Sequence, residues 1–275
     1  MFSFFKMQAT GNDFVLIDYI ENKLDYSYKL LSQYLCDRHY GIGADGVLIL
    51  EKSKIADFRM RIFNQDGSEA EMCGNGIRCI GKYIYEKKLI KQKELKIETM
   101  AGIKNIRLEV EGSTVLNVEV DMGIPKFELK EIPIIYMDGN YDGKLHIENI
   151  EVYPVSIGNP HAVCFVNDVK NIDIKKYGSL IEDYKYFPNK TNVEFVQIID
   201  KSNIKVRIWE RGVGETLSCG TGSCAAAVIS NKYKSTDNEI FVDLLGGKLN
   251  VKYDNTIRLK GNAENIFEGK FLWNF

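Results

Sequence analysis

A chain of 275 residues exceeds the commonest single-domain size, and at roughly 150 residues per domain it predicts about two domains. Its 36 basic and 38 acidic residues nearly balance, which argues against a nucleic-acid binding surface. The N-terminal segment has neither a basic start nor a sustained apolar core, and no run of about eighteen apolar residues follows it. Neither a signal peptide nor a membrane span is therefore expected.

Short segments in which apolar and polar residues alternate run along most of the chain. They are 58–63, 95–100, 106–112, 114–123, 192–200, 204–209, 249–254 and 256–261. This period of two, with Gly, Asn and Asp between the segments, predicts mainly antiparallel sheet. The C-terminal segment 265–275 is too apolar for a tail and is predicted to return as a strand to one of the domains.

Two helices are predicted, and each begins just after a cysteine. In segment 77–90, Ile77, Ile80 and Ile84 recur at spacings of three and four and form one apolar stripe. Segment 223–233 is nearly apolar all round until Asn231, which predicts a buried helix wrapped by sheet.

An internal repeat links these two regions. Residues 61–76 align with 207–222 without a gap, at a constant offset of 219 − 73 = 146, and Arg, Ile, Glu, Cys, Gly and Gly coincide. Chance similarity between short strands is one explanation, and duplication of a whole domain is the favoured one. Gly and Pro at 121–125 predict the boundary, which gives a half at 1–120, completed by 264–275, and a half at 121–263.

The cysteines are the candidate chemical groups. There are six, at positions 36, 73, 79, 164, 219 and 224, without a C-x-x-C pair, so free thiols in a reducing cytoplasm are expected. The spacings suit structural zinc poorly, and no metal is expected. Cys73 precedes Gly-Asn-Gly and Cys219 precedes Gly-Thr-Gly, so each sits where a helix start leaves amides unpaired. The helix dipole should favour ionisation of these thiols, although either cysteine alone could be a small buried residue beside a turn.

Such a pair suits the inversion of a carbon beside a carboxylate. A thiolate on one domain would remove a proton from one face while a thiol on the other domain delivers one to the opposite face. Backbone amides at the two glycine-rich turns would hold the carboxylate and stabilise the developing enolate charge.

Six ordered motifs resemble the diaminopimelate epimerase family over essentially the whole chain. They lie at 10–18, 39–48, 61–79, 156–163, 191–195 and 210–227. The resemblance implies an α/β (α+β) fold of two pseudo-symmetric domains, each a mostly antiparallel sheet wrapped around a central helix, usually as a homodimer. It also implies interconversion of LL- and meso-2,6-diaminopimelate without a cofactor, in lysine and peptidoglycan precursor biosynthesis.

By the same resemblance, Cys73 and Cys219 are the acid/base pair. The backbone of four residues would hold the reacting carboxylate: Gly74, Asn75, Gly220 and Thr221. The resemblance also implies that the distal amino-acid end of the substrate is bound by Asn12, Asn64, Asn159, Asn192, Glu210 and Arg211. From local sequence alone, asparagines in loops usually stabilise turns. His161 is expected either to hydrogen-bond to a catalytic sulfur or to be a satisfied core histidine.

The sequence is also compatible with three other functions. A proline racemase would also use paired cysteines, but it has no need for the distal motifs. A thiol redox sensor would use a disulfide between Cys73 and Cys219, and an amino-acid binding module would need neither thiol. The expected partners are a small amino-acid substrate and a second copy of the chain, with no nucleic acid and no membrane.

Overall fold

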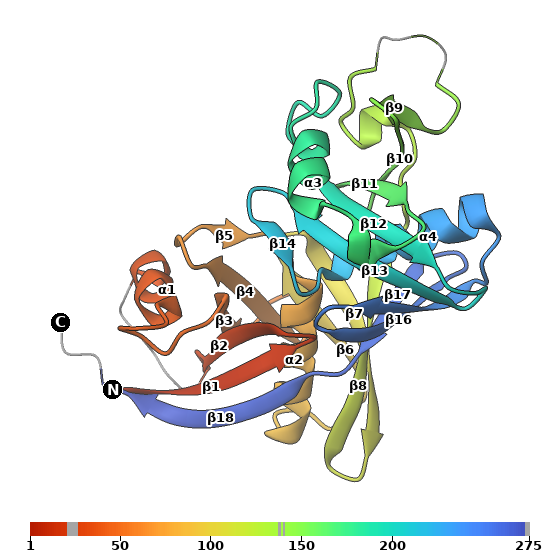
Figure 1. The fold of residues 1–275 in the computed structure, drawn as a ribbon. Coiled ribbons are helices and arrows are strands. Elements are labelled where there is room, and N and C mark those ends of the chain that lie inside the picture. The colour runs from red at the N-terminus through yellow and green to blue at the C-terminus, as the bar shows by residue number, and fades with distance from the viewer. Residues whose placement is uncertain (21–26, 137–138, 140, 273–275) are drawn as a thin grey trace. The chain divides into compact units, whose positions relative to one another are not determined.

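The computed structural model describes residues 1–20, 27–136, 139 and 141–272, which form two compact units (Figure 1). Unit 1 comprises Met1–Asp121 and Lys260–Phe275, and unit 2 comprises Met122–Leu259. The chain therefore returns to unit 1 at Lys260 rather than at the expected 264. Residues 273–275, the end of the predicted returning segment, lie outside the described residues.

Unit 1 is a sheet with helices α1 (Tyr28–Cys36) and α2 (Gly74–Glu86). Its strands are β1 (Phe2–Ala9), β2 (Asn12–Asp18), β3 (Gly46–Glu51), β4 (Phe58–Asn64), β5 (Glu69–Ala70), β6 (Glu94–Thr99), β7 (Gly102–Glu111), β8 (Thr114–Gly123) and β18 (Glu264–Phe271). They pair in the order β18, β1, β2, β3, β4, β6, β7, β8, with β5 beside β4. The β2–β3 and β4–β6 pairs are parallel because α1 and α2 provide the crossovers.

Unit 2 follows the same plan, with helices α3 (Ile174–Glu182) and α4 (Gly220–Lys234) and the 3-10 turns η1 (Leu129–Glu131) and η2 (Val169–Asn171). Its strands are β9 (Leu145–Ile147), β10 (Ile150–Ser156), β11 (Pro160–Phe165), β12 (Asn192–Ile198), β13 (Asn203–Glu210), β14 (Gly214–Thr216), β15 (Glu239–Leu244), β16 (Gly247–Tyr253) and β17 (Ile257–Gly261). The β11–β12 and β13–β15 pairs are parallel around α3 and α4, and the other pairings in the series from β9 to β16 are antiparallel.

The order of elements repeats between the units. The series β1, β2, α1, β3, β4, β5, α2, β6, β7, β8 recurs as β10, β11, α3, β12, β13, β14, α4, β15, β16, β17. The predicted fold class of two pseudo-symmetric, mostly antiparallel halves is confirmed.

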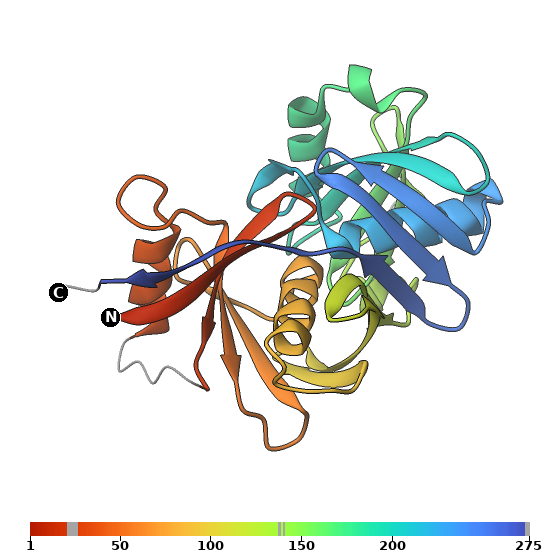
Figure 2. The ribbon, with the colours of Figure 1, turned by 90° about the horizontal axis from the view of Figure 1, so that it is seen from below.

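Each of α2 and α4 is the central helix of its unit (Figure 2). Helix α2 packs against β1, β2, β3, β4 and β7, and α4 packs against β10, β11, β12, β13 and β16. Ile77, Ile80 and Ile84 are fully buried, as their spacing predicted, and Gly222–Ser230 of α4 is buried all round. None of the helices in the described part of the chain is long and apolar enough to cross a membrane.

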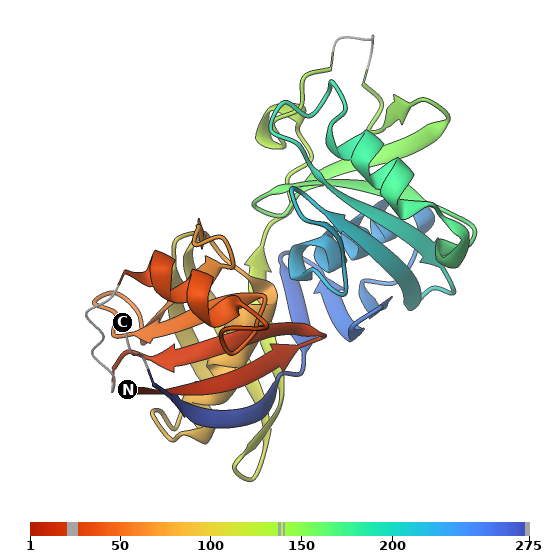
Figure 3. The same ribbon diagram turned by 60° about the vertical axis from the view of Figure 1, so that its left-hand side comes forward.

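Helices α1 and α3 cover the opposite face of their sheets (Figure 3). On β3, Val47 and Ile49 pack in one cluster with the α1 side chains, whereas Leu48 points toward α2. On β12, Val193 and Phe195 pack with α3 in the same way. Both faces of these strands are thus covered. The sequence did not indicate α1 and α3, because each is nine residues long and buries only part of its surface.

Candidate functional site

The two predicted catalytic cysteines cap the two central helices in the same conformation. Cys73 has φ −138° and ψ 120° before α2, and Cys219 has φ −132° and ψ 124° before α4. Each sulfur accepts a hydrogen bond from the amide three residues later, from Gly76 and from Gly222, at 3.4 Å. Each thiol therefore lies at the positive end of a helix dipole and takes the place of an N-cap oxygen.

Gly76 and Gly222 are required by close packing at these helix starts. A Cβ atom on Gly76 would lie 2.8 Å from Cδ2 of Leu48 on β3. On Gly222 it would lie 2.8 Å from Oε1 of Glu194 on β12. The glycine at the third helical position thus lets each central helix, and its cysteine, sit against the sheet.

Asn12 is the side chain beside Cys73. Its Oδ1 lies 3.8 Å from the Cys73 sulfur and accepts a hydrogen bond from Nδ2 of Asn75 at 3.1 Å. Its Nδ2 donates to Oδ2 of Asp45 at 2.9 Å. Because an ionised carboxylate only accepts hydrogen bonds, Asp45 fixes the amide so that the carbonyl oxygen faces the thiol.

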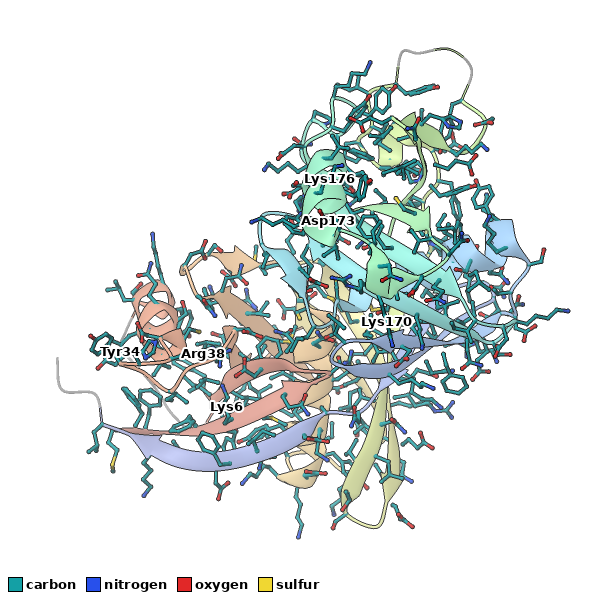
Figure 4. All side chains as sticks on the ribbon, in the orientation of Figure 1. Lys6, Tyr34, Arg38, Lys170, Asp173 and Lys176 are labelled. Carbon is teal, nitrogen blue, oxygen red and sulfur yellow. The ribbon has the colours of Figure 1, made fainter. Side chains whose placement is uncertain are left out.

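A charged network holds Asp45 in turn. Arg38 donates from Nη2 to Asp45 and to Asp13, both at 2.9 Å, and Lys6 donates to Asp13 at 2.5 Å. Burial acts to raise the pKa of Asp13, but hydrogen bonds from Arg38 and Lys6 bring it below its usual range. Figure 4 labels Lys6 on β1 and Arg38 after α1. The sequence alone did not indicate a role for these residues, although Asp45 lies within the motif at 39–48.

A hydrogen-bonded chain leads away from Cys219. Oγ1 of Thr221 lies 3.3 Å from the sulfur, and Nδ2 of Asn159 donates to that Oγ1 at 3.4 Å. Asn159 Oδ1 lies 2.9 Å from Nε2 of His161, whose Nδ1 lies 2.7 Å from Oε1 of Glu194. His161 is thus a fully buried histidine with both ring nitrogens bonded, and it reaches the sulfur through Asn159 and Thr221.

The expectation of an easily ionised thiol is wrong for Cys219. Burial raises its pKa well above the ordinary value, and the Glu210 carboxylate adds to the rise. Hydrogen bonds from Thr221 and from the Gly222 amide act in the opposite direction. The helix start is where the sequence placed it, but desolvation of the sulfur is the largest influence on its pKa.

Glu210 and Asn64 occupy equivalent ends of strands β13 and β4. Burial raises the pKa of Glu210, and its Oε1 accepts a hydrogen bond from Thr216 at 2.6 Å. Asn64 is exposed and donates from Nδ2 to Ser68 at 3.0 Å. Glu210 interacts electrostatically with Cys219, so the structure brings it into the group around that thiol.

Asn192 and Arg211 are joined to each other. Oδ1 of Asn192 accepts from the Arg211 amide at 3.0 Å, and its Nδ2 donates to the Pro160 carbonyl at 2.9 Å. The exposed Arg211 guanidinium donates to the Asn189 carbonyl at 3.2 Å. Asn192 therefore acts here on the backbone that carries Arg211, and the Arg211 side chain remains accessible.

The remaining cysteines, Cys36, Cys79, Cys164 and Cys224, are buried. All six cysteines are free, and burial raises the pKa of Cys36 and of Cys79 to about 12. Burial also raises the pKa of Cys164. Across residues 1–20, 27–136, 139 and 141–272, no group of three or more His, Cys, Asp and Glu side chains is placed to hold a metal ion.

Comparison with known proteins agrees with this arrangement. The model of the family described as diaminopimelate epimerase matches residues 4–128 and 153–265. A diaminopimelate epimerase from Agathobacter rectalis is 46% identical over 280 residues, which cover 97% of this chain and 98% of the relative. One from Methanococcus maripaludis is 44% identical over 275 residues, with coverage of 97% and 98%. The solved hydroxyproline epimerase from Agrobacterium vitis has the same fold, with a TM-score of 0.71, 14% identity, and coverage of 97% of this chain and 91% of that one. The chain therefore belongs to the diaminopimelate epimerase family.

Proposed function

We propose that this protein interconverts LL- and meso-2,6-diaminopimelate by proton transfer between two thiols, in lysine and peptidoglycan precursor biosynthesis and without a cofactor. The observation that carries the proposal is the pair of cysteine caps, Cys73 and Cys219, in matching conformations at matching helix starts. Inversion of a carbon needs one group to remove the α-proton and a second group to deliver one to the opposite face. Two like groups also let the reaction run in both directions, because acid and base exchange roles.

The carboxylate at the reacting carbon would be held by backbone amides at the two helix starts. Gly74 and Asn75 open α2, and Gly220 and Thr221 open α4. The first amides of a helix point outward along the dipole, so they can bind the carboxylate and stabilise it more strongly as it gains enolate character. Removal of the α-proton by a thiolate leaves a thiol and an enolate. Proton delivery by the other thiol then restores the carboxylate and leaves a second thiolate.

Cys219 holds its proton more strongly than an ordinary cysteine, because burial and the neighbouring Glu210 raise its pKa. It would therefore begin the cycle as the proton donor. The hydrogen bonds from Thr221 and from the Gly222 amide would stabilise the thiolate that remains after the transfer.

The distal amino-acid end of the substrate would be recognised by polar side chains of both halves. We assign this role to Asn12, Asn64, Asn159, Asn192, Glu210 and Arg211. The exposed guanidinium of Arg211 suits a carboxylate, and Glu210 suits an ammonium group. Asn192 would act through the Arg211 backbone that it holds.

The proposal is tested by incubating fully reduced protein separately with LL-diaminopimelate, L-proline and trans-4-hydroxy-L-proline and separating the stereoisomers by chiral chromatography. We expect the meso isomer from the first substrate and no inversion of the other two. Inversion of a proline substrate without conversion of diaminopimelate would favour the racemase alternative. Conversion that survives complete alkylation of both thiols would exclude the two-thiol mechanism.

We further propose a homodimer that works in the cytoplasm. Ile266 and Phe267 of β18 support the dimer, because they are 52% and 47% exposed on a strand that ends the pairing order of unit 1. The free state of all six cysteines suits a reducing compartment. Light scattering on the purified protein measures its oligomeric state. A mass of one chain at micromolar concentration would contradict the homodimer.

A further inference from the structure

The register of the strands places Glu194 and His161 where the other half of the molecule has apolar residues. On β3, Leu48 pairs with Ile62, and on β12, Glu194 pairs with Ile208. A Cβ atom added to Gly76 would meet Leu48 and Ile62, and one added to Gly222 would meet Glu194 and Ile208. Leu48 and Glu194 are thus structurally equivalent.

His161 has an apolar equivalent in the same way. Phe14 pairs with Gly46 across the parallel β2–β3 ladder, and His161 pairs with Asn192 across β11–β12. Gly46 and Asn192 each begin the second strand of their pair. Unit 1 therefore holds Phe14 at the position of His161.

The fold does not need a polar pair at this place. Phe14 and Leu48 are 2% and 0% exposed, and His161 and Glu194 are both 0% exposed. Burial of a carboxyl group and an imidazole costs desolvation energy that an apolar pair avoids. Oε2 of Glu194 moreover has no hydrogen-bond partner within the described residues. Since unit 1 folds with the apolar pair, the polar pair in unit 2 requires a reason other than folding.

The hydrogen bonds show what the pair does to its neighbours. Asn159 donates from Nδ2 to Thr221, so its Oδ1 faces His161 and Nε2 of His161 must carry a proton. Nδ1 of His161 then shares one proton with Oε1 of Glu194. Glu194 thereby fixes the tautomer of His161, and His161 fixes the orientation of the Asn159 amide.

This orientation decides the role of Thr221. When Oγ1 of Thr221 accepts a hydrogen bond from Asn159, its own proton is available for the Cys219 sulfur 3.3 Å away. A reversed Asn159 amide would present Oδ1 instead and draw the Thr221 proton away from the sulfur. A donor to the sulfur stabilises the thiolate.

We propose that Glu194 is a positioning residue that acts through His161, Asn159 and Thr221 to stabilise the thiolate of Cys219. The neighbour of Cys73 is of a different kind, because Asn12 turns its carbonyl oxygen toward that sulfur. The duplicated thiols are therefore chemically unequal, and the difference originates in one half of the sheet. The inference rests on the proposed acid/base role of Cys219.

Other titratable groups lie near Glu194 and His161 and interact with them electrostatically. The charge of the Glu194 carboxylate acts directly to raise the pKa of Cys164 on β11 and of Cys219 at the start of α4, so it opposes the effect of the hydrogen-bonded chain on Cys219. Glu210 at the end of β13 interacts with His161 and Glu194. Burial raises the pKa of Glu194, which agrees with a proton shared with His161.

The test follows the pH dependence of iodoacetamide alkylation at Cys219 and Cys73 separately, by mass spectrometry of the digested full chain. We expect Glu194→Leu to raise the pH midpoint of alkylation at Cys219 by about half a unit to one unit, because the loss of a donor to the sulfur outweighs the loss of repulsion by the Glu194 charge, and to leave Cys73 unchanged. Glu194→Gln should not raise the midpoint, since the glutamine amide can donate to Nδ1 of His161 and carries no charge that repels the Cys219 thiolate. No substrate is involved, so the result is readable even if the protein fails to epimerise diaminopimelate.

Two further variants separate positioning from folding. The double variant His161→Phe with Glu194→Leu recreates the apolar pair of unit 1, so it should fold and still show the raised midpoint at Cys219. Glu182→Gln alters another buried carboxylate of unit 2, bound to Trp209 and the Gly212 amide, and should leave the midpoint unchanged. An unchanged or lowered Cys219 midpoint in Glu194→Leu and in the double variant would overturn the proposal. Equal shifts at Cys73 and Cys219 would do the same.

Discussion

Cys73 and Cys219 share a backbone conformation but not an environment. Cys73 is partly exposed beside the Asn12 carbonyl oxygen, whereas Cys219 is 9% exposed among Thr221, Glu210 and the Gly222 amide. The backbone is set by the glycine-rich turn and therefore repeats with the sequence. The environment is set by side chains of neighbouring strands, which differ between the halves. Equivalent backbone geometry and different side-chain environments thus coexist in one duplicated site.

The raised pKa of Cys219 has a measurable consequence at the scale of the residue. In the unliganded protein its thiolate should appear only at a pH above that of an ordinary cysteine, because burial penalises the charged form. Alkylation of Cys219 should therefore be slow at neutral pH and should accelerate as the pH rises. An unfolded sample of the same chain serves as the control. Equal alkylation midpoints in the folded and unfolded chain would contradict the assigned cause.

At the scale of elements, the strand–turn–helix segments explain why the repeat is visible in the sequence. Arg61 donates to both carboxylate oxygens of Glu69 at 2.7 and 2.8 Å, and Arg207 donates to those of Glu215 at 2.7 and 3.1 Å. These ion pairs join β4 to β5 and β13 to β14 immediately before each cysteine. The Arg, Glu, Cys and Gly residues that coincide in the alignment therefore belong to a strand–turn–helix segment that occurs once in each unit.

The glycines at the third position of α2 and α4 provide a matched pair of substitutions. A Cβ in Gly76→Ala meets the flexible end of Leu48, which can move aside, whereas in Gly222→Ala it meets the Glu194 carboxyl group held by His161. We expect Gly222→Ala to reduce kcat/KM by about tenfold or more, through a loss of about 1.5 kcal/mol or more of transition-state stabilisation, and Gly76→Ala to reduce it less. Steady-state kinetics on both variants compares them, with thermal denaturation as a check on folding. A larger loss in Gly76→Ala would contradict the asymmetry.

At the scale of the whole molecule, the sequence predicted what is local or repeated and missed what depends on contacts between distant segments. The offset of 146 residues and the glycine-rich turns indicated two halves and both capping cysteines. The apolar stripe of Ile77, Ile80 and Ile84 indicated the first central helix. The pairing of Glu194 with His161 was not predictable, because alternation on β12 suggests that Glu194 faces solvent. It is buried because helices cover both faces of that strand.

The anchoring of Asn12 by Asp45 illustrates the same limit. These residues are separated by more than thirty positions and meet because β2 and β3 pair in parallel. In a single sequence, an asparagine after a glycine indicates a turn, and an aspartate between alanine and glycine indicates another. Only the register of the ladder brings the two side chains together, so the orientation of the amide beside Cys73 follows from the fold.

The most direct measurement is α-proton exchange of LL-diaminopimelate in heavy water, followed by proton NMR with reduced wild-type protein, Cys73→Ser and Cys219→Ser. We expect deuterium entry together with formation of the meso isomer in the wild type. We expect a loss of epimerisation of at least a thousandfold in each variant, because inversion needs both groups. Epimerisation by either single variant at a rate near that of the wild type would contradict the two-thiol mechanism, as would formation of the meso isomer without deuterium at the α-carbon.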